Sequence, residues 1–420
     1  MLLNHFHNGS ELLQDVSLKD ASASTLTTSR HRERTMIDPA CAFPVTGNLI
    51  HLNHAAVGPW PRVTVDAVKA FAEENALQGS LDYTKWIDTE QRLRQQLAVL
   101  LNAASVSEIA FVNNTSEGLS IVAAGIDWRE GDHVVGIRQE FPSNRFPWLA
   151  LRQKGVEFRQ LDLAFCDADP EAALMAMCNE KTRVVTVSAV QYATGFRMDL
   201  ERLGQFCRSR GILFCVDAIQ QAGAIPLDLQ QIKADFATAD GHKWLLSPEG
   251  LGFLYIREEL LEKLLLTRFG WHMAEEMSDY EAVDFLPARS ARRFECGSPN
   301  MLGIHALSAS VGLLLDIGLE NVWETLSRRV DLLRSGLDGM RGIELVSDGS
   351  PGRRSGILTF RLSRRDSAEL FSVLQGAGVF CALRGGGIRL SPHFYTPLEQ
   401  IERVLSLIEN YSRSSIAGVS

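Results

Sequence analysis

The stretch RVVTVSAVQYATGFRMDLERLGQFCRSRGILFCVDA, residues 183–218, holds two short apolar runs on either side of an amphipathic segment. The runs at 183–190 and 212–218 are rich in β-branched residues and are short, which is typical of buried strands. Residues 199–211 carry apolar side chains at helical spacing. A strand, a helix and a second strand in this order predict two parallel strands that are joined by a crossover helix.

The same alternation extends along the chain on both sides of this unit. Apolar runs at 109–113 and 133–137 are followed by amphipathic stretches at 115–126 and 143–155. After about residue 305 the pattern changes to one long helical segment, 305–337, and then to short strands and helices. The fold class predicted is therefore α/β, with a large, doubly wound, mostly parallel sheet and a smaller carboxy-terminal α/β domain.

We divide the chain into four predicted parts. Residues 1–35 are rich in Ser, Thr and charge and are expected to form a disordered leader. Residues 36–64 form an amino-terminal segment, 65–304 the large domain and 305–420 the small domain.

Length and composition exclude several classes of protein. The chain has 420 residues, a net charge of −9 and dispersed aromatic residues, which disfavours nucleic acid or an anionic membrane as a partner. No apolar run is long enough to span a bilayer and no signal peptide is evident, so we expect a cytoplasmic protein. The seven cysteines are scattered without a Cys-x-x-Cys pair, which argues against a zinc site and a disulfide framework.

Ligands of doubly wound sheets bind beyond the carboxyl ends of the strands, so polar residues that follow strands are candidates for a site. Thr115 and Ser116 follow one strand at the start of a helix, where hydroxyls and free N–H groups suit a phosphate. Taken alone, an ordinary helix cap explains this pair better. Asp217 ends a second strand, and Gln220 follows one turn later; a cap and a solvated amide explain them equally well.

Lys243 follows a third strand, in ATADGHKWLL at 237–246. Trp244 and neighbouring apolar residues partly shield this lysine, which favours loss of its proton and a nucleophilic amine. An amine, a phosphate seat and a buried acid together specify pyridoxal phosphate: the lysine forms a Schiff base, the helix end binds the phosphate, and the acid pairs with the pyridine nitrogen. Alone, Lys243 is better explained as a turn lysine.

The chain from about His51 to the last helix resembles the class V aminotransferase family. The motifs that carry this resemblance are NNTSEG, VDAIQQAG, DGHKWLLSPEGLG, RFECGSPNMLGIHAL and RGGGIRLSPHFY. This family belongs to the pyridoxal phosphate enzymes of fold type I, which have the aspartate aminotransferase-like architecture. It includes cysteine desulfurases, isopenicillin N epimerase and kynureninase.

The resemblance implies roles for individual residues. Lys243 is similar to the Schiff-base lysine, Asp217 to the partner of the pyridine nitrogen and Gln220 to the donor to the phenolic oxygen of the cofactor. Further cofactor contacts are implied for Thr115, Ser116 and His242. Ser298 is similar to a hydroxyl residue that reaches the phosphate of the other subunit, which implies a homodimer with shared active sites. Arg389 is similar to the arginine that binds the substrate α-carboxylate.

The chain also departs from this family. Phe141 stands where cysteine desulfurases have a histidine over the cofactor ring; it can stack on the ring but cannot carry a proton. Desulfurases place a nucleophilic cysteine between arginines that match Arg384 and Arg389, and here this interval is GGGI. Cys381 precedes it in an apolar run and is expected to be buried and unreactive.

We therefore expect an enzyme that acts at the α-carbon of an amino acid, with transamination as the first choice. A β-lyase of the C–S type or an amino-acid epimerase is the alternative, and a true cysteine desulfurase or a non-catalytic cofactor-binding scaffold ranks lower. Segment 36–64 is expected to pack near the active site with His54 beside the substrate, and Trp271 is a candidate for an aromatic lid. His51 and His54 lack an accompanying carboxylate cluster, so no metal site is expected.

Overall fold

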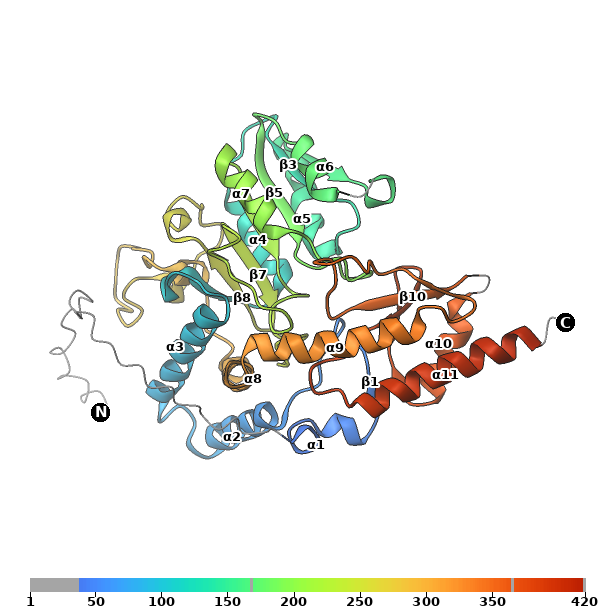
Figure 1. Ribbon diagram of the computed structural model, residues 1–420. Helices are drawn as coiled ribbons and strands as arrows, with labels where there is room; N and C mark the ends of the chain where they lie inside the picture. Colours follow the sequence, from blue (N-terminus) through green and yellow to red (C-terminus); the bar gives the residue numbers. More distant parts are fainter. Residues whose placement is uncertain (1–37, 167–168, 364–365, 418–420) are drawn as a thin grey trace, which may run out of the picture. The chain divides into compact units, whose positions relative to one another are not determined.

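A computed structural model describes residues 38–166, 169–363 and 366–417 (Figure 1). The predicted leader, residues 1–35, lies outside the described residues. The remaining chain, from Asp38 onward, groups as one compact unit.

The large sheet that the alternation of strands and helices predicted is present, and it has seven strands. Their order across the sheet is β2 (Ile109–Val112), β8 (Gly252–Ile256), β7 (Phe236–Asp240), β6 (Leu213–Asp217), β5 (Thr182–Ser188), β3 (His133–Ile137) and β4 (Glu157–Leu161). Neighbouring strands from β7 to β4 are parallel, whereas β8 runs antiparallel to both β2 and β7. The antiparallel β8 was not predicted.

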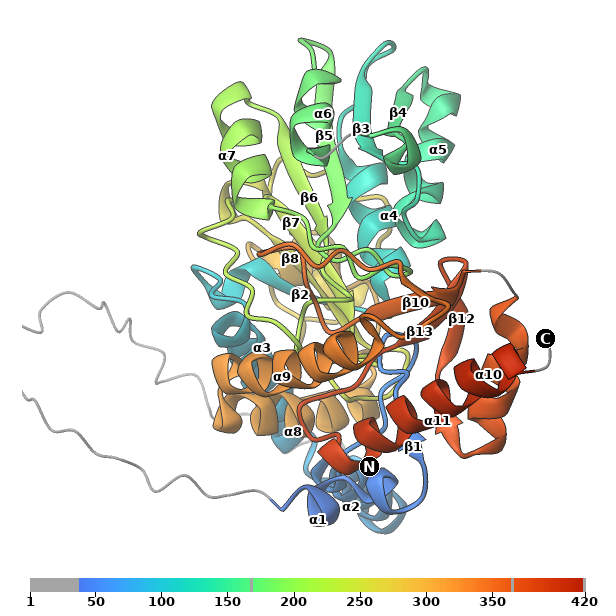
Figure 2. The same ribbon diagram turned by 45° about the vertical axis from the view of Figure 1, so that its right-hand side comes forward.

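Successive side chains of a strand point to opposite faces of the sheet, and both faces are buried here. On β5, Val185 and Val187 belong to one apolar core and Val184 to the other. Cys215 of β6 likewise lies in a different core from its neighbours Phe214 and Val216. Helices cover each face, α6 and α7 on one side and α4 and α5 on the other (Figure 2). This double burial explains why the strands read as continuous apolar runs.

The α-helices lie before, between and after these strands along the chain. Their bounds are α1 (Pro39–Ala42), α2 (Arg62–Gln78), α3 (Tyr83–Leu100), α4 (Thr115–Gly125), α5 (Phe146–Ala150), α6 (Pro170–Ala176), α7 (Leu200–Arg210), α8 (Met301–Ile317), α9 (Leu319–Leu337), α10 (Ser367–Gly376) and α11 (Leu398–Ala417). Short 3₁₀ helices are η1 (Pro44–Gly47), η2 (Val106–Glu108), η3 (Pro142–Asn144), η4 (Leu151–Lys154), η5 (Leu163–Phe165), η6 (Glu258–Leu260), η7 (Trp271–Met273) and η8 (Ala291–Phe294).

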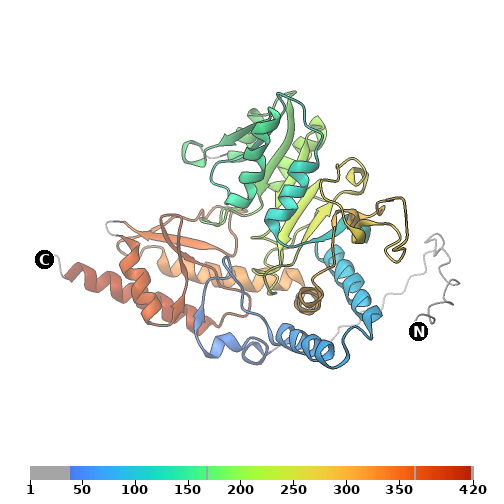
Figure 3. The same ribbon diagram turned by 180° about the vertical axis from the view of Figure 1, so that it is seen from behind.

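A second, antiparallel sheet lies in the carboxy-terminal part of the chain. It has the order β12 (Ala382–Arg384), β13 (Gly387–Leu390), β10 (Leu358–Leu362) and β9 (Ile343–Leu345). The amino-terminal segment joins this part, because β1 (Ile50–His51) pairs in parallel with β11 (Val379–Phe380). Figure 3 shows the blue amino-terminal segment beside these red elements. The domain division at residue 304 stays a prediction.

The long helical segment expected at 305–337 consists of two helices. Helix α8 ends at Ile317, α9 begins at Leu319, and their axes differ by 82°. Gly318 between them has φ of +84°, a value that other residues rarely adopt, and it breaks the helix. Among the described residues no single helix has the length and hydropathy of a membrane span; α8 and α9 meet that test only as this bent pair.

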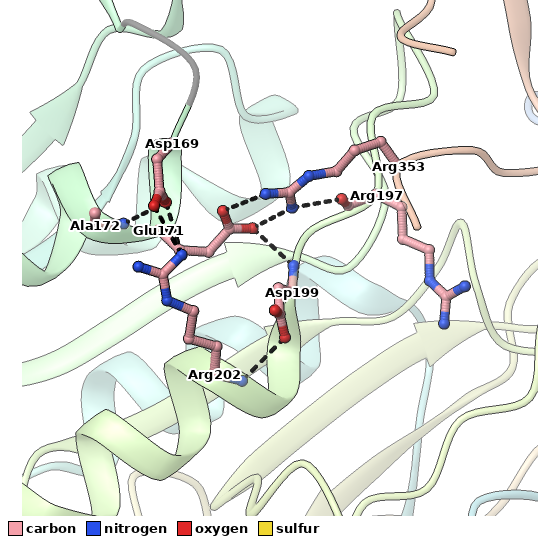
Figure 4. A network of polar contacts seen from close by, with 7 residues as sticks. All are labelled: Asp169, Glu171, Ala172, Arg197, Asp199, Arg202 and Arg353. Atoms are coloured by element: carbon pink, nitrogen blue, oxygen red, sulfur yellow. Dashed lines mark hydrogen bonds and ion pairs between the residues drawn. The ribbon is translucent and has the colours of Figure 1, made fainter. Parts of the chain in front are cut away.

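An ion pair joins the two sheet regions (Figure 4). Arg353, in the loop between β9 and β10, donates to both carboxylate oxygens of Glu171 on α6, at 2.5 and 2.8 Å. Glu171 also accepts from the backbone N–H of Asp199 at 2.7 Å, and its side chain is fully buried. Burial favours a raised pKa for Glu171, but these hydrogen bonds outweigh it and lower the pKa.

Arg353→Ala is expected to lower the free energy of unfolding by about 3 kcal/mol, because it leaves a buried carboxylate without its cation. The pair stabilises the fold above the pKa of the unfolded carboxyl and loses this effect as pH falls through the lower folded pKa. The difference between variant and wild type should therefore shrink in acid. Urea unfolding at several pH values measures it.

Arg354→Ala is the matched control for this measurement. Arg354 pairs with Asp331 at 2.5 Å, but both side chains are more than 40% exposed, so its loss should cost less than about 1 kcal/mol. Equal losses for the two variants, or a loss for Arg353→Ala that does not depend on pH, would contradict this account of the ion pair.

Candidate active site

A cavity of about 300 Å³ lies at the carboxyl ends of β6 and β7 and reaches β13 of the small sheet. Its lining residues are Ala55, Ala56, Val57, Asn114, Thr115, Ser116, Phe141, Ser143, Tyr192, Asp217, Ile219, Gln220, Asp240, His242, Lys243, Glu249, Arg384 and Arg389. Eight of the predicted site residues are in this set. A larger cleft of about 970 Å³, between α7 and the start of α9, contains none of them.

Asp217 is the last residue of β6, near the middle of the sheet, and is 2% exposed. Its Oδ1 accepts a hydrogen bond from the N–H of Ile219 at 3.1 Å. Burial raises the pKa of Asp217 to about 6, while this bond and the charge of Lys243 oppose the rise. A carboxylate in such a place is stabilised by a cationic partner, so the cavity suits a positively charged ligand atom here.

Lys243 follows β7 by three residues, and its side chain is almost fully buried. Burial lowers the pKa of Lys243 to about 8, against the charge of Asp217, which raises it. Nζ lies 5.7 Å from the centre of the Phe141 ring, and no hydrogen bond or ion pair of Nζ is found within the described residues. The amine is therefore accessible to a ligand and is partly neutral near pH 8.

The start of helix α4 also lines the cavity. Its first residue is Thr115, and the N-cap Asn114 accepts from the N–H of Glu117 at 3.0 Å. The Oγ1 atom of Thr115 is buried and has no hydrogen-bond partner. Ser116 Oγ donates to Ser143 Oγ at 2.7 Å. A helix start with an unpartnered buried hydroxyl can accept an anion.

Arg389 on β13 lies at the small-sheet side of the cavity and is 3% exposed. Nη1 donates to the carbonyl of Tyr192 at 2.7 Å, and Nη2 donates to Asn53 Oδ1 at 3.3 Å. Nε is buried without a partner. Burial, followed by the charge of Arg384, lowers the pKa of Arg389 to about 10. The guanidinium is thus held in place with an N–H donor to spare, as carboxylate binding requires.

The segment 192–195, whose first carbonyl accepts the hydrogen bond of Arg389, is itself bound to the small sheet region. Successive carbonyls of 193, 194 and 195 accept from the hydroxyls of Thr359, Ser347 and Ser355. The ring of Tyr192, which precedes these carbonyls, meets the Phe141 ring edge-on at 5.2 Å. Tyr192 thus contacts Phe141 through its ring and Arg389 through its carbonyl. The hydrogen bonds of residues 193–195 therefore fix the position of both contacts.

Comparison with known proteins decides the family. The family model described as Aminotransferase class-V matches residues 50–404. The chain belongs to the class V aminotransferase family. A probable cysteine desulfurase of Methanothermobacter thermautotrophicus is 31% identical over 391 residues, covering 87% of this chain and 96% of the relative. A cysteine desulfurase of Salmonella gallinarum is 28% identical over 346 residues, covering 80% and 83%.

Solved structures agree on the fold. A complex of the cystine C–S lyase C-DES with its product cysteine persulfide has a TM-score of 0.81 and 25% identity, and covers 87% of this chain and 99% of its own. An apo cysteine desulfurase of Thermococcus onnurineus has a TM-score of 0.79 at 23% identity, covering 90% and 98%. The predicted fold type I is confirmed, and the protein is an enzyme of the pyridoxal phosphate group of class V.

The cavity of this class V enzyme fits the predicted cofactor, pyridoxal phosphate, which family membership confirms. The unpartnered hydroxyl of Thr115 at the start of α4 suits the phosphate, and the buried Asp217 suits the pyridine nitrogen. Lys243 offers the amine. The same lining includes Gln220, whose Nε2 donates to the Ala55 carbonyl at 3.0 Å. The individual roles of these residues stay predictions.

His242 also lines the cavity, as the resemblance implies. Its Nδ1 lies 2.9 Å from Asp240 Oδ1, although the two atoms are not aligned as a hydrogen bond. The Asp240 carboxylate is thus turned toward the His242 imidazole. This contact makes the negative charge of Asp240 tolerable in the lining of the cavity.

Three predicted site residues do not line the cavity of their own chain. His54 is fully buried behind it, with Nδ1 against the Ser391 carbonyl at 2.9 Å and Nε2 accepting from Tyr395 Oη at 2.6 Å. The substrate contact predicted for His54 gains no support from this position, and Ala55 to Val57 line the cavity instead. Trp271 is 40% exposed on η7, and Ser298 is exposed after η8. The role of Ser298 at a neighbouring subunit and the role of Trp271 as an aromatic lid stay predictions.

Sequence reasoning missed several residues of the lining. Tyr192 lies in the loop after β5, Ser143 lies on η3 after β3, and Glu249 precedes β8. Their only sequence signal is proximity to motifs already singled out. Arg384 was used only as a landmark, yet it lines the cavity.

The interval between Arg384 and Arg389 is a tight hairpin. Arg384 pairs with Gly387 across it, and Gly385 and Gly386 have φ of +62° and +75°, as a two-residue turn requires. Cys381 before this hairpin is 3% exposed, and burial raises its pKa to about 12. No cysteine is among the described residues that line the cavity. A thiol at this place would need a different loop.

One group among the described residues, Glu90, His272 and Glu295, has a spacing that could hold a metal ion. Arg94 already occupies the space between the carboxylates, at 2.8 Å from Glu90 Oε1 and 2.7 Å from Glu295 Oε1. Its guanidinium supplies the positive charge there, so we infer no metal from this group.

Proposed function

We propose that this class V enzyme is a C–S β-lyase, which eliminates a sulfur substituent from the β-carbon of an amino acid and releases it into solution. The observation that carries the proposal is a cavity in which Lys243, Asp217 and Arg389 converge while the described lining holds no thiol. This set supports chemistry at the α-carbon but offers no acceptor for a sulfur atom on the protein.

The relatives support C–S chemistry in particular. Those reported above are named cysteine desulfurases, and one structural relative is a cystine C–S lyase. A desulfurase needs a nucleophilic thiolate, whereas an elimination does not. The short hairpin and the buried Cys381 therefore favour the lyase. Transamination, our first expectation, has no specific observation in its favour.

In the proposed reaction Arg389 binds the α-carboxylate of the substrate through its free N–H groups and fixes its orientation. Lys243 takes the α-proton as general base, which its lowered pKa permits near pH 8. Asp217 holds the positive charge of the ring nitrogen. Bound pyridoxal phosphate supplies the electron sink for the charge left at the α-carbon. For cystine, one water is consumed, and pyruvate, ammonium and cysteine persulfide are released.

The wall formed by Phe141 bears on the choice of substrate. This aromatic ring gives no proton to a leaving group, so a sulfur that is stable as an anion leaves more readily on this side of the cavity. A thiol of lower pKa leaves more readily. We therefore propose disulfide amino acids such as cystine, which release a persulfide, ahead of cysteine itself. We include in the proposal a homodimer in which Ser298 faces the site of the partner subunit, and an aromatic lid at Trp271.

The products test this proposal. Incubation of the holoenzyme with cystine, without a keto acid, should yield pyruvate and ammonium over many turnovers. Transamination would instead stop after one equivalent of keto acid and leave the cofactor in its amine form. Epimerisation would yield the D-amino acid. If no amino acid gave a product, the non-catalytic cofactor-binding scaffold would be the remaining alternative.

The pH dependence of cofactor loading is a further prediction. When cofactor-free protein is mixed with pyridoxal phosphate, the rate of attachment to Lys243 should rise with pH through about 8 and then level off, since only the neutral amine attacks the aldehyde. Asp217→Asn should move the midpoint to lower pH, because the Asp217 anion raises the pKa of Lys243. Stopped-flow absorbance measures both. An unmoved midpoint in the variant would contradict this coupling.

A further inference from the structure

Gln220 is held at both ends of its side-chain amide. Its Oε1 accepts from the indole Nε1–H of Trp244 at 2.8 Å, and its Nε2 donates to the carbonyl of Ala55 at 3.0 Å. Gln220 is 2% exposed and Trp244 is 1% exposed. Solvent therefore does not compete for either bond, and both are worth more than they would be at the surface.

The two partners of this amide cannot exchange roles. An indole N–H only donates and a backbone carbonyl only accepts. Turning the amide over would set the –NH₂ group against the Trp244 N–H and the amide oxygen against the Ala55 oxygen, leaving four buried polar groups without partners. The orientation is thus determined by chemistry. One Nε2–H remains after the bond to Ala55, so Gln220, which lines the cavity, keeps a donor for a ligand there.

Trp244 is itself unable to turn away. The far edge of its indole lies against the small domain, where a Cβ on Gly356 would come within 2.6 Å of Cη2. Its ring also packs against the imidazoles of His54 and His393, with ring centres 6.0 and 5.5 Å away. These contacts come from three segments that are far apart in sequence. The indole N–H is therefore a fixed point in the protein.

We propose that Trp244 is a positioning residue for the reaction, because its indole N–H makes Gln220 an obligatory donor to an anionic oxygen in the cavity. This inference rests on the proposed function and on the role that the family resemblance implies for Gln220, in which that oxygen is the phenolate of the cofactor. A donated hydrogen bond favours the phenolate over its protonated form. Trp244 lies next to Lys243 in sequence and acts only through Gln220.

The test compares Trp244→Phe, Gln220→Ala and the double variant. For each holoenzyme the pH at which the visible absorption band of the bound cofactor changes is titrated. Trp244→Phe keeps an aromatic ring but lets the amide turn, so the midpoint should rise by about one unit, the shift expected for one hydrogen bond to a charged group. Gln220→Ala should raise it as much. The double variant should match Gln220→Ala, since the two residues act as one unit.

Trp86→Phe is the matched control. It also removes a buried indole N–H bonded to a side-chain oxygen, Glu74 Oε1 at 2.9 Å, but between α2 and α3. Its midpoint should equal that of the wild type. A Trp244→Phe midpoint that equals the wild-type value, or a double variant whose shift is the sum of the single shifts, would overturn the proposal.

A second readout needs no cofactor. In the apoprotein labelled with ¹⁵N-tryptophan, the Trp244 indole N–H should exchange with solvent slowly, and Gln220→Ala should speed this exchange at least tenfold without affecting Trp86. Unchanged exchange would overturn the proposal even where Trp244→Phe fails to fold. Failure of the proposed function is recognised separately, because the wild-type holoenzyme would then release no pyruvate from cystine while its exchange and its midpoint remain measurable.

Discussion

Lys243→Ala is expected to lower turnover by about 10⁴-fold or more. The substitution removes the covalent attachment point of the cofactor and the base that takes the α-proton, and general base catalysis alone contributes about 10²- to 10⁴-fold. Steady-state pyruvate formation measures the loss. Cofactor content should fall much less, because the start of α4 and Asp217 remain in the cavity.

Borohydride reduction complements this experiment. In the wild type, reduction followed by peptide mapping should find the cofactor on the peptide that contains Lys243, and Lys181→Ala, at an exposed lysine, should change nothing. Label on another lysine, or near-normal turnover of Lys243→Ala, would be incompatible with the proposed site.

Arg389→Ala is expected to lower kcat/KM for amino acids roughly 30- to 5000-fold. This factor corresponds to a loss of about 2 to 5 kcal/mol of binding free energy, the range for truncating one partner of a buried charge pair. Arg389→Lys should restore only part of the loss, because an ammonium supplies charge without the planar fork. Competition between substrates with and without an α-carboxylate measures the effect, and only the former should be weakened.

Cys381→Ala is the control for the arginine variants. Cys381 lies eight positions before Arg389 in the same part of the small domain and is equally buried, so it reports general damage from a truncated side chain at this place. It should change activity little. Loss of sulfur release in Cys381→Ala, with normal activity of Arg389→Ala, would reverse the two assignments.

The parts of the site that depend on local sequence could be predicted. Asp217 and Lys243 each follow an apolar strand, and the carboxyl ends of neighbouring parallel strands meet at one edge of the sheet, so their convergence follows from the pattern. Thr115 opens a helix after another strand by the same logic. Helices on both faces of the sheet were implied by strands that are short, mostly apolar runs.

The remaining features depend on tertiary packing that no local pattern encodes. The antiparallel direction of β8 and the pairing of β1 with β11 are set by the path of the chain in space. His54 was expected beside the substrate, yet its bonds to Ser391 and Tyr395 turn it into the protein. Tyr192 enters the cavity because the small sheet holds the carbonyls that follow it. Gly318 was visible in the sequence, but the 82° bend that it permits was not.

The fate of the sulfur atom tests the central claim most directly. After a single turnover of the holoenzyme with cystine, and separately with cysteine, the protein is analysed by intact-mass and peptide mass spectrometry and the small molecules are quantified. The account predicts that no cysteine peptide gains a sulfur atom and that pyruvate forms in step with sulfur released into solution. A persulfide on Cys381 or another protein thiol, with alanine as the amino-acid product, would contradict the account and make the protein a desulfurase.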